Sequence, residues 1–361
     1  NLSKIYLDAY RQQSGSGGSR YPDANQAINN KLFSGTLIWN YSGHGGFRRL
    51  AEEVVLDQDM VNSWNNPDRL PLFITATCDF APYDNPAVNS IGENILVREK
   101  TGAIALMTTT RVVFAFSNRI INNNYFQMAL ATDANGIFPT LGEAMKKAKN
   151  YTYLNFGDVI NNRKFTLLGD PAVRLGFPTL KVKTTSINNQ APSADTLKAL
   201  DRYTIKGEVT DASGNRMTGF NGNVYPVIFD KVQQVKTFGN DATSNVVIFN
   251  NQTNIIFKGK AKVTNGQFSY TFVVPKDINY QFGNGKINYY AEDGTKDGNG
   301  AETSIVVGGA GTNPISDQTG PTIKGWLNDK KFVNGGIANQ TPVLLLNLVD
   351  SSGINTVGTG I

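Results

Sequence analysis

Residues 36–46 (TLIWNYSGHGG) decide the fold class of the N-terminal half, because a short apolar run there ends in a Gly-rich turn. That turn carries the only histidine of the chain, His44. A second apolar run, residues 72–78 (LFITATC), ends at the only cysteine, Cys78, and a third occupies residues 102–110 (GAIALMTTT). Strands that are apolar on both faces are typical of a parallel sheet covered by helices. The three runs therefore predict such a sheet, with the histidine and the cysteine at the carboxyl ends of two strands.

Segments with helical periodicity separate and follow these strands. Three of them place apolar residues on one face: residues 88–99, 118–131 and 140–151. In the last segment Lys146, Lys147 and Lys149 fall on the outward side, and we expect a solvated face there rather than a nucleic-acid site. Alternating strands and helices predict an α/β sandwich over residues 1–178, in which ligands bind at the carboxyl ends of the strands.

The pattern changes near residues 176–178 (GFP), beyond which helical periodicity fades. Six later segments are rich in β-branched and aromatic residues and predict strands: 203–209, 224–229, 246–249, 255–260, 268–274 and 286–291. Asn-Gly pairs, such as Asn265-Gly266, indicate turns between them. We therefore expect an all-β domain of immunoglobulin-like type, a β-sandwich, over residues 179–310. Residues 311–361 are expected to be a linker and the start of a further β-domain that is cut short.

Composition excludes several classes of protein. The 361 residues are 40% hydrophobic and 17% charged, so the bulk of the chain is not expected to be disordered. A formal net charge of +5 is spread along the chain, and no nucleic-acid partner is expected. A single cysteine excludes an internal disulfide framework and a multi-cysteine zinc site. We expect neither a metal nor a cofactor. No apolar run approaches the roughly 18 residues that cross a bilayer.

His44 and Cys78 are the residue types that cysteine proteolysis requires. The reaction needs a thiolate, a base that forms it and later protonates the leaving amine, and donors for an oxyanion. The backbone N–H groups of Gly45 and Cys78 would point into one shared space. Taken alone, a cysteine after an apolar strand is more often a small buried residue, and a histidine among glycines a loop residue. Because both are unique and both end core strands, we interpret them as a catalytic pair.

Three residues beside this pair are candidates for substrate binding: Gly46, Asp79 and Phe80. For Phe80, packing in the core is the default alternative to substrate binding, and Phe73 and Phe114 are expected in the core.

Residues 40–46 (NYSGHGG), followed by residues 74–78 (ITATC), resemble the gingipain family of caspase-fold (clan CD) cysteine peptidases. Residues 165–172 (FTLLGDPA) are similar to the motif that closes the catalytic domain of that family. The resemblance implies a caspase/gingipain-like sandwich over residues 1–178, with a mostly parallel sheet whose first strands lie outside this sequence. It also implies that His44 is the base, that Cys78 is the nucleophile, and that the Gly45 and Cys78 N–H groups form the oxyanion hole. An acidic residue that orients the histidine is expected upstream of this sequence.

Within that family, residues 78–86 (CDFAPYDNP) are similar to the loop after the cysteine in the sortases of Bacteroidetes type IX secretion systems. Residues 350–361 look like the start of the C-terminal module of those sortases. The resemblance implies an enzyme on the bacterial cell surface, held at the outer membrane by a barrel partner. Such an enzyme removes the C-terminal signal domain of secreted cargo proteins through a Cys78 acyl-enzyme. It then attaches the cargo to an amine of anionic lipopolysaccharide.

Two alternatives remain open at the level of sequence. A secreted gingipain-like protease would resolve the same acyl-enzyme with water, and a non-catalytic peptidase-fold scaffold would form none. The intact histidine and cysteine favour an enzyme, and the C-terminal segment favours a sortase.

Overall fold

The computed structural model describes residues 2–134, 136–312, 319–350 and 354. The chain forms two compact units. The α/β unit consists of Lys4–Phe177 and Lys236–Ile248, and the β unit consists of Asn1–Ser3, Pro178–Val235 and Phe249–Ile361.

A four-stranded sheet forms the centre of the α/β unit, with the strand order β3-β6-β7-β8. Its strands are β3 (Ile38–Ser42), β6 (Leu72–Ala76), β7 (Ala105–Thr109) and β8 (Phe165–Leu168). The first three strands run parallel, and β8 pairs antiparallel with β7. Every residue of β6 and β7 is buried, which agrees with their unbroken apolar sequences. The mostly parallel sheet that the sequence predicts is therefore present.

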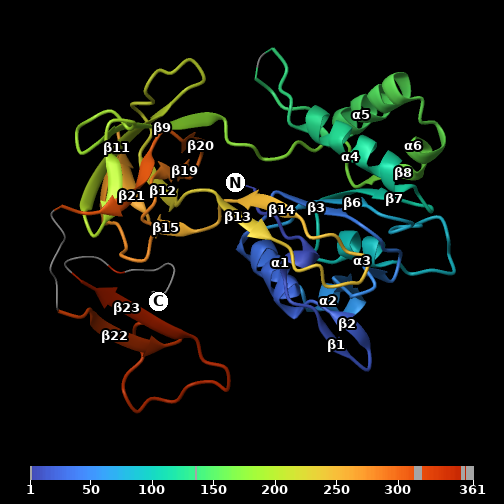
Figure 1. Cartoon of the computed structure of the whole chain (residues 1–361), viewed down its shortest axis with the longest axis horizontal. Coiled ribbons are helices and arrows are strands. Elements are labelled where there is room, and N and C mark those ends of the chain that lie inside the picture. The colour runs from blue at the N-terminus through green and yellow to red at the C-terminus, as the bar shows by residue number, and fades with distance from the viewer. Residues whose placement is uncertain (1, 135, 313–318, 351–353, 355–361) are drawn as a thin grey trace. The chain divides into compact units, whose positions relative to one another are not determined.

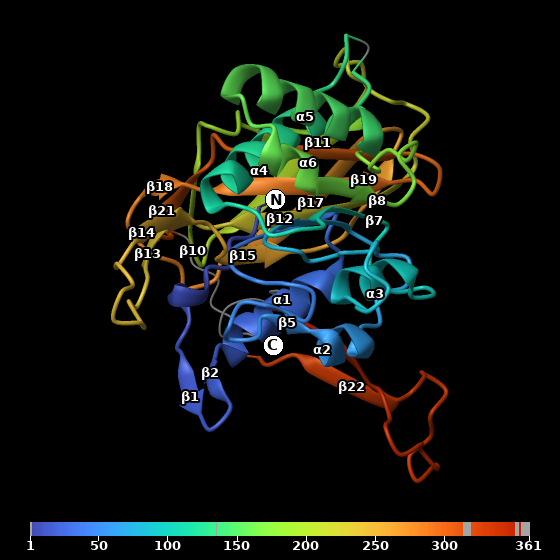
Figure 2. The same cartoon turned by 90° about the vertical axis from the view of Figure 1, so that its right-hand side faces the viewer.

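Helices cover both faces of this sheet (Figure 1). On one face α1 (Pro22–Ser34), α2 (Gln58–Ser63) and α3 (Ile91–Val97) share a core with Phe73 and Leu106. On the other face α4 (Ala115–Ala129) and α5 (Leu141–Phe156) share a core with Leu72, Ile74 and Met107. Successive residues of one strand thus enter opposite cores, as the period of two requires. Figure 2 shows the same two helical layers from the side.

Capping residues define where the helices start. The Thr140 hydroxyl accepts a hydrogen bond from the Glu143 N–H, and the Glu143 carboxylate accepts one from the Thr140 N–H. Ser90 and Glu93 form the same reciprocal pair before α3. Within α5, Lys149 differs from the solvated face that we predicted. Its Nζ donates to the Phe165 carbonyl at 2.8 Å, and burial lowers its pKa.

The remaining elements of the α/β unit are short. They are the 3₁₀ turn η1 (Leu7–Ala9), β1 (Gln13–Gly15), β2 (Gly18–Arg20), β4 (Arg49–Leu50), β5 (Leu56–Asp57) and α6 (Ile160–Lys164). The segment Lys236–Ile248 joins this unit through Asp8, whose carboxylate accepts hydrogen bonds from the N–H groups of Gly239 and Asn240.

The β unit is built on one large antiparallel-rich sheet with the order β15-β12-β16-β17-β11-β9-β20-β19. Its strands are β9 (Leu180–Ile187), β11 (Arg202–Thr210), β12 (Gly222–Phe229), β15 (Ile255–Lys258), β16 (Ala261–Thr264), β17 (Gln267–Val273), β19 (Lys286–Glu292) and β20 (Asp297–Glu302). An additional pairing of β12 with β19 closes this sheet on itself. A second sheet contains β10 (Thr196–Ala199), β21 (Val306–Ala310) and β18 (Gly283–Asn284), and β13 (Gln233–Lys236) pairs with β14 (Ile248–Asn251).

The closed sheet corrects one expectation. An immunoglobulin-like sandwich keeps two open sheets face to face, whereas the β12–β19 ladder makes the main sheet barrel-like. The all-β character is confirmed, and so is the hairpin at Asn265-Gly266. These two residues have φ angles of 51° and 73° and connect β16 directly to β17, as a two-residue hairpin turn requires.

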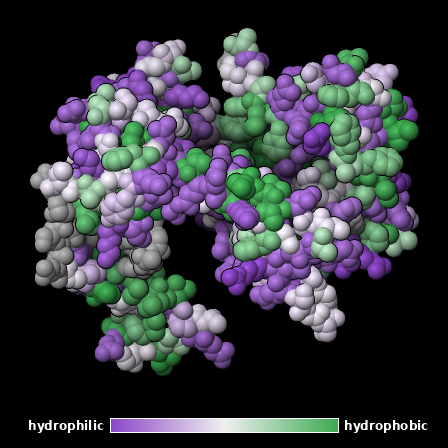
Figure 3. Space-filling model, viewed as in Figure 1, coloured by the Kyte–Doolittle hydropathy of each residue, from purple (hydrophilic) through white to green (hydrophobic). Residues whose placement is uncertain are grey.

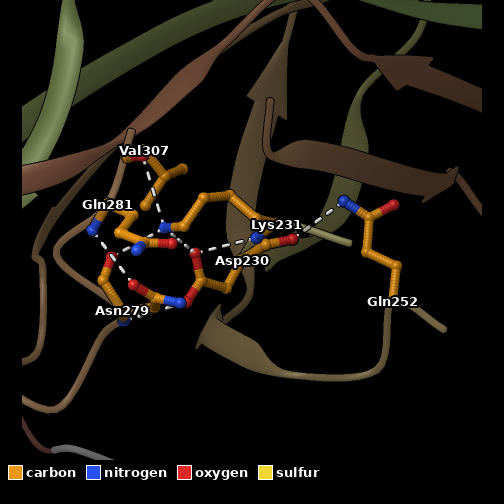
Figure 4. A network of polar contacts seen from close by, with 6 residues as sticks. All are labelled: Asp230, Lys231, Gln252, Asn279, Gln281 and Val307. Carbon is orange, nitrogen blue, oxygen red and sulfur yellow. Dashed lines mark hydrogen bonds and ion pairs between the residues drawn. The ribbon is translucent and has the colours of Figure 1, made fainter. Parts of the chain in front are cut away.

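The β unit contains a buried ion pair within a network of polar contacts (Figure 4). The Lys231 Nζ lies 2.6 Å from the Asp230 carboxylate and also donates to the carbonyls of Asn279 and Val307. Gln252 donates to the Asp230 carbonyl. The side chains of Lys231 and Asp230 are only 10% and 1% exposed, so each charge depends on the other.

The C-terminal part of the β unit contains a two-stranded sheet of its own, a hairpin of β22 (Thr322–Leu327) and β23 (Leu344–Val349). Ile323, Leu344 and Leu346 are exposed on it, and Figure 3 shows apolar residues gathered over this hairpin. Most of the predicted C-terminal module, residues 351–353 and 355–361, lies outside the described residues. In the described part of the chain, no helix is both long and apolar enough to cross a membrane.

Candidate active site

The strand register brings the two candidate catalytic residues to the same edge of the sheet. In the parallel pair of β3 and β6, Ser42 lies opposite Ala76. The Gly43 N–H extends the pairing by donating to the Ala76 carbonyl at 3.5 Å. His44 and Cys78 each follow the paired residue by two positions, and adjacent strands lie about 4.8 Å apart. The register thus places both residues at matching positions of neighbouring strand ends.

Tyr41 holds the backbone of the histidine turn. Its hydroxyl donates to the His44 carbonyl at 2.7 Å, and the Ala51 N–H donates to the same oxygen at 2.9 Å. The ring of Tyr41 stacks on Trp39, which in turn stacks on Phe73 with the ring centroids 4.0 Å apart. Burial, together with the nearby charge of Glu53, raises the pKa of Tyr41 to about 12. The hydroxyl therefore stays protonated as a donor across the neutral range, while the His44 side chain remains exposed.

Gly45 fits directly against the strand that carries the cysteine. A Cβ at this position would come within 2.9 Å of both the Thr77 Oγ1 and the Leu50 Cδ2. Real Cβ atoms do not approach neighbours so closely, so only glycine fits without a shift of the surroundings. Because Thr77 precedes Cys78, this contact joins the histidine turn to the cysteine loop.

The N–H groups of Gly45 and Cys78 are available as donors. Gly45 bridges Leu50, but the hydrogen bonds of this bridge come from the neighbouring Gly46 and Ala51 N–H groups. Neither the Gly45 N–H nor the Cys78 N–H has a hydrogen-bond partner among the described residues. Unpaired N–H groups on two adjoining turns are what an oxyanion site needs.

The Cys78 thiol is half-buried and donates to the Val113 carbonyl, with 3.6 Å between Sγ and O. This carbonyl belongs to the loop after β7, which two side chains hold in place. The Asn161 Oδ1 accepts from the Phe114 N–H, and the Lys164 Nζ donates to the Val112 carbonyl at 2.7 Å. The thiol thus rests against a fixed loop, and thiolate formation must release this weak hydrogen bond.

The three residues predicted to contact substrate, Gly46, Asp79 and Phe80, differ in their exposure to solvent. Phe80 is fully buried and stacks near Phe73 in the core, so its expected role in substrate binding is corrected. Asp79 is half-exposed, and its Oδ1 lies 4.0 Å from the position that a Cβ of Gly46 would take. Both Asp79 and Gly46 therefore remain at the surface beside the pair. Phe114, which we predicted in the core, is 62% exposed.

One ion pair that shapes the site was not predicted from the sequence. The Arg111 guanidinium donates to both oxygens of Asp84, at 2.9 and 2.6 Å. These hydrogen bonds hold the pKa of Asp84 below its ordinary value. The pair ties the loop after the cysteine to the loop after β7, across 27 positions of sequence. No local pattern marks such a pair, because either residue alone is an ordinary surface charge.

A pocket of about 380 Å³ lies between these loops, with Phe47, Asp79, Asp84 and Arg111 among its lining residues. In the residues that the structure describes, no three histidine, cysteine or acidic side chains are grouped to hold a metal ion. The site thus offers a thiol, an imidazole, two free N–H donors and an adjoining pocket. This set of groups can carry out acyl transfer through a cysteine nucleophile.

Part of the chain matches the model of a known protein family. Residues 1–176 match peptidase family C25. Among solved structures, the chain is similar to dimeric latent PorU from Porphyromonas gingivalis, with 32% sequence identity and a TM-score of 0.42 over 73% of this chain and 25% of that chain. A comparison with curated proteins finds no match.

The chain is also similar to the Arg-specific cysteine proteinase gingipain R, with 14% identity and a TM-score of 0.40 over 78% of this chain and 56% of that chain. For a complex of the pro- and mature domains of RgpB from Porphyromonas gingivalis, the identity is 15% and the TM-score 0.39 over 78% and 57%. This chain thus spans a quarter of the PorU chain and little more than half of the other two.

Proposed function

Residues 1–176 of this chain belong to peptidase family C25, and on that premise we propose that the protein is a cysteine peptidase with Cys78 as nucleophile and His44 as general base. The observation that carries the proposal is the register of β3 and β6, which sets the two residues at matching strand ends. The contact of Gly45 with Thr77 supports it, because it joins the two turns.

The reaction follows from these groups. The Cys78 thiol gives its proton to His44, and the thiolate attacks the carbonyl carbon of the scissile bond. The oxyanion that forms accepts hydrogen bonds from the N–H groups of Gly45 and Cys78. Protonated His44 then donates to the departing amine, which leaves an acyl-enzyme on Cys78. A nucleophile that gives its proton to His44 resolves this thioester and restores the enzyme.

We further propose that the resolving nucleophile is an amine, so that the enzyme acts as a sortase. The support is the likeness of residues 78–86 to the loop after the cysteine in type IX secretion sortases. The cargo would be secreted proteins whose C-terminal signal domain is removed. The acceptor would be an amine of anionic lipopolysaccharide. The enzyme would act on the cell surface, beside a barrel protein of the outer membrane.

The test is conversion of a cargo protein that carries its signal domain, followed by intact-mass spectrometry. The wild-type protein is expected to release the signal domain and to show the cargo fragment as a thioester on Cys78. Cys78→Ala should leave the cargo uncut, whereas Glu99→Gln, a change at an exposed carboxylate outside the site, should cut it at the wild-type rate. Cutting by Cys78→Ala would refute the proposed nucleophile.

A second arm separates transfer from hydrolysis. With a primary amine present, a sortase yields cargo whose new C-terminus carries that amine. Cargo that ends in a free carboxylate, at every amine concentration, would leave a hydrolytic peptidase and eliminate the sortase.

A further inference from the structure

The pocket beside the nucleophile is made by the three loops that follow β3, β6 and β7. Phe47 comes from the histidine turn, Asp79 and Asp84 from the loop after the cysteine, and Arg111 from the loop after β7. Its volume of about 380 Å³ lies within the range of small-molecule sites. The pocket and the catalytic pair therefore share the same loops, and a group bound in the pocket lies next to the reacting bond.

These loops are fixed by hydrogen bonds before any ligand binds. The Asp79 N–H donates to the Arg111 carbonyl at 3.1 Å, and the Phe47 carbonyl accepts from the Ile91 N–H at the start of α3. The Asp84–Arg111 pair joins two of the loops directly. A pocket with such walls needs little ordering on binding.

The charges that line the pocket do not cancel. Arg111 is already paired with Asp84, because both of its terminal nitrogens contact that carboxylate, and its Nη1 also donates to the Thr110 carbonyl at 2.7 Å. Within the described part of the chain, the Asp79 carboxylate has neither a hydrogen bond nor an ion pair, and its charge acts on Arg111 only from a distance, helping to raise the pKa of that group. Two carboxylates, Asp79 and Asp84, thus face one guanidinium. The lining therefore carries one unbalanced negative charge. The rest of the wall includes apolar surface from Phe47, Pro86 and Val112.

A negative charge beside an apolar wall favours the binding of a cation that carries a carbon chain. An ammonium can bind the Asp79 carboxylate, and a carbon chain attached to it can contact the apolar wall. An anion would meet unbalanced negative charge at Asp79. The position facing Gly46 is open, since a Cβ there would meet only the Asp79 Oδ1, at 4.0 Å.

We propose that this pocket binds the alkylammonium group of the acceptor that resolves the acyl-enzyme, with Asp79 as the residue that recognises it. The inference rests on the proposed sortase function and deepens it. At neutral pH an acceptor amine arrives protonated and cannot attack until it loses a proton. Asp79 would bind the ammonium next to the thioester, because it directly follows Cys78 in the chain. His44 follows the neighbouring strand β3 at the same edge of the sheet.

The step balances in protons and bonds. After acylation His44 is neutral, because it has given its proton to the leaving amine. The bound ammonium transfers one proton to His44, and the free amine attacks the thioester carbonyl. The carbon–sulfur bond breaks, the second proton of the attacking nitrogen goes to the departing thiolate, and an amide remains. His44 then releases its proton to solvent.

The experiment measures how the acyl-enzyme partitions between added nucleophiles and water. The probes are n-butylamine, which is charged at neutral pH, and hydroxylamine, which is largely uncharged. For Asp79→Asn we expect the half-saturating concentration of butylamine to rise about tenfold, the loss of one charge-assisted contact. The partition ratio with hydroxylamine should stay within about twofold of wild type. Asp79→Glu should restore part of the butylamine response, and the control Glu99→Gln should behave as wild type.

Equal butylamine curves for wild type and Asp79→Asn would overturn the inference. So would a variant that is impaired only in acylation by substrates with a lysine after the scissile bond, since the pocket would then bind a substrate side chain.

A binding measurement tests the ammonium site independently of whether the enzyme acts as a sortase. Butylamine is titrated into Cys78→Ala, which cannot form an acyl-enzyme, and the amide resonances of the pocket loops are followed by NMR. Shifts that vanish in Cys78→Ala/Asp79→Asn support the ammonium site even if only water resolves the acyl-enzyme. An absence of shifts in Cys78→Ala refutes the site whatever the catalytic result.

Discussion

Replacing Tyr41 with phenylalanine removes one hydroxyl from the histidine turn and leaves its ring in the aromatic stack. The lost group is the donor to the His44 carbonyl at 2.7 Å. The Ala51 N–H still binds that oxygen, so the turn is weakened and not broken. We expect Tyr41→Phe to lower the free energy of unfolding at pH 8 by about 1 kcal/mol.

The same change is expected to have the opposite effect in alkali. Burial, then the charge of Glu53, raises the pKa of Tyr41 to about 12 in the folded protein, against about 10 in an unfolded chain. The folded state therefore keeps a proton that the unfolded state loses. The associated stability is complete below pH 10 and is lost as the pH rises toward 12. A shift of two units corresponds to a loss of about 2 kcal/mol at pH 12.

The wild-type protein should therefore have the higher free energy of unfolding near neutral pH, and Tyr41→Phe the higher one in alkali. Wild type is expected to be the more stable by about 1 kcal/mol at pH 8, and the variant by about 1 kcal/mol at pH 12, with a crossing near pH 11. Urea unfolding followed by tryptophan fluorescence measures this, since Trp39 and Trp64 lie in or against the core of the α/β unit. Other tyrosines titrate equally in both proteins and cancel in the difference. A difference that stays constant from pH 8 to pH 12 would refute the assigned environment of Tyr41.

Three further substitutions test separate parts of the structure. Gly45→Ala places a Cβ 2.9 Å from the Thr77 Oγ1, so it should cost about 1–3 kcal/mol of stability and lower kcat in a cargo-cleavage assay; unchanged values would contradict the close fit. Lys231→Met leaves Asp230 buried without its cation, and chemical denaturation should show a loss of about 3–5 kcal/mol, a loss under 1 kcal/mol being inconsistent with the pair. Tyr125 is fully buried, and its hydroxyl has no partner among the described residues. Tyr125→Phe should therefore raise the unfolding free energy by about 1 kcal/mol, and a decrease would reveal a missing partner.

The parts of the α/β unit that follow from local pattern could be predicted from sequence. The unbroken apolar runs before His44 and Cys78 correspond to β3 and β6, because a strand buried on both faces has no polar positions. Thr140 and Glu143 mark the start of α5 through a pair of hydrogen bonds that spans only three residues. Such signals depend on neighbours in the chain, so a single sequence contains them.

Long-range contacts explain what the sequence did not reveal. The β12–β19 ladder closes the sheet of the β unit across more than 50 residues, and a strand pattern does not say which strands pair. Arg111 and Asp84 meet only because two loops adjoin.

Two aromatic residues illustrate the same limit. Phe80 enters the core, so its candidate role in substrate binding is wrong and its alternative of core packing is confirmed; Phe114, expected in the core, faces solvent. Both residues follow strand ends, where the backbone leaves the regular alternation that assigns a side chain to one face.

The central claim is that His44 and Cys78 act as one unit, and alkylation of the thiol tests it most directly. Cys78 is the only cysteine and His44 the only histidine of the chain, so iodoacetamide labelling at neutral pH reports one site and His44→Gln removes one base. General base assistance is worth about 10²–10⁴-fold. We predict that His44→Gln slows alkylation of Cys78 at least about tenfold, while Glu99→Gln leaves its rate unchanged. Equal rates in wild type and His44→Gln would contradict the claim.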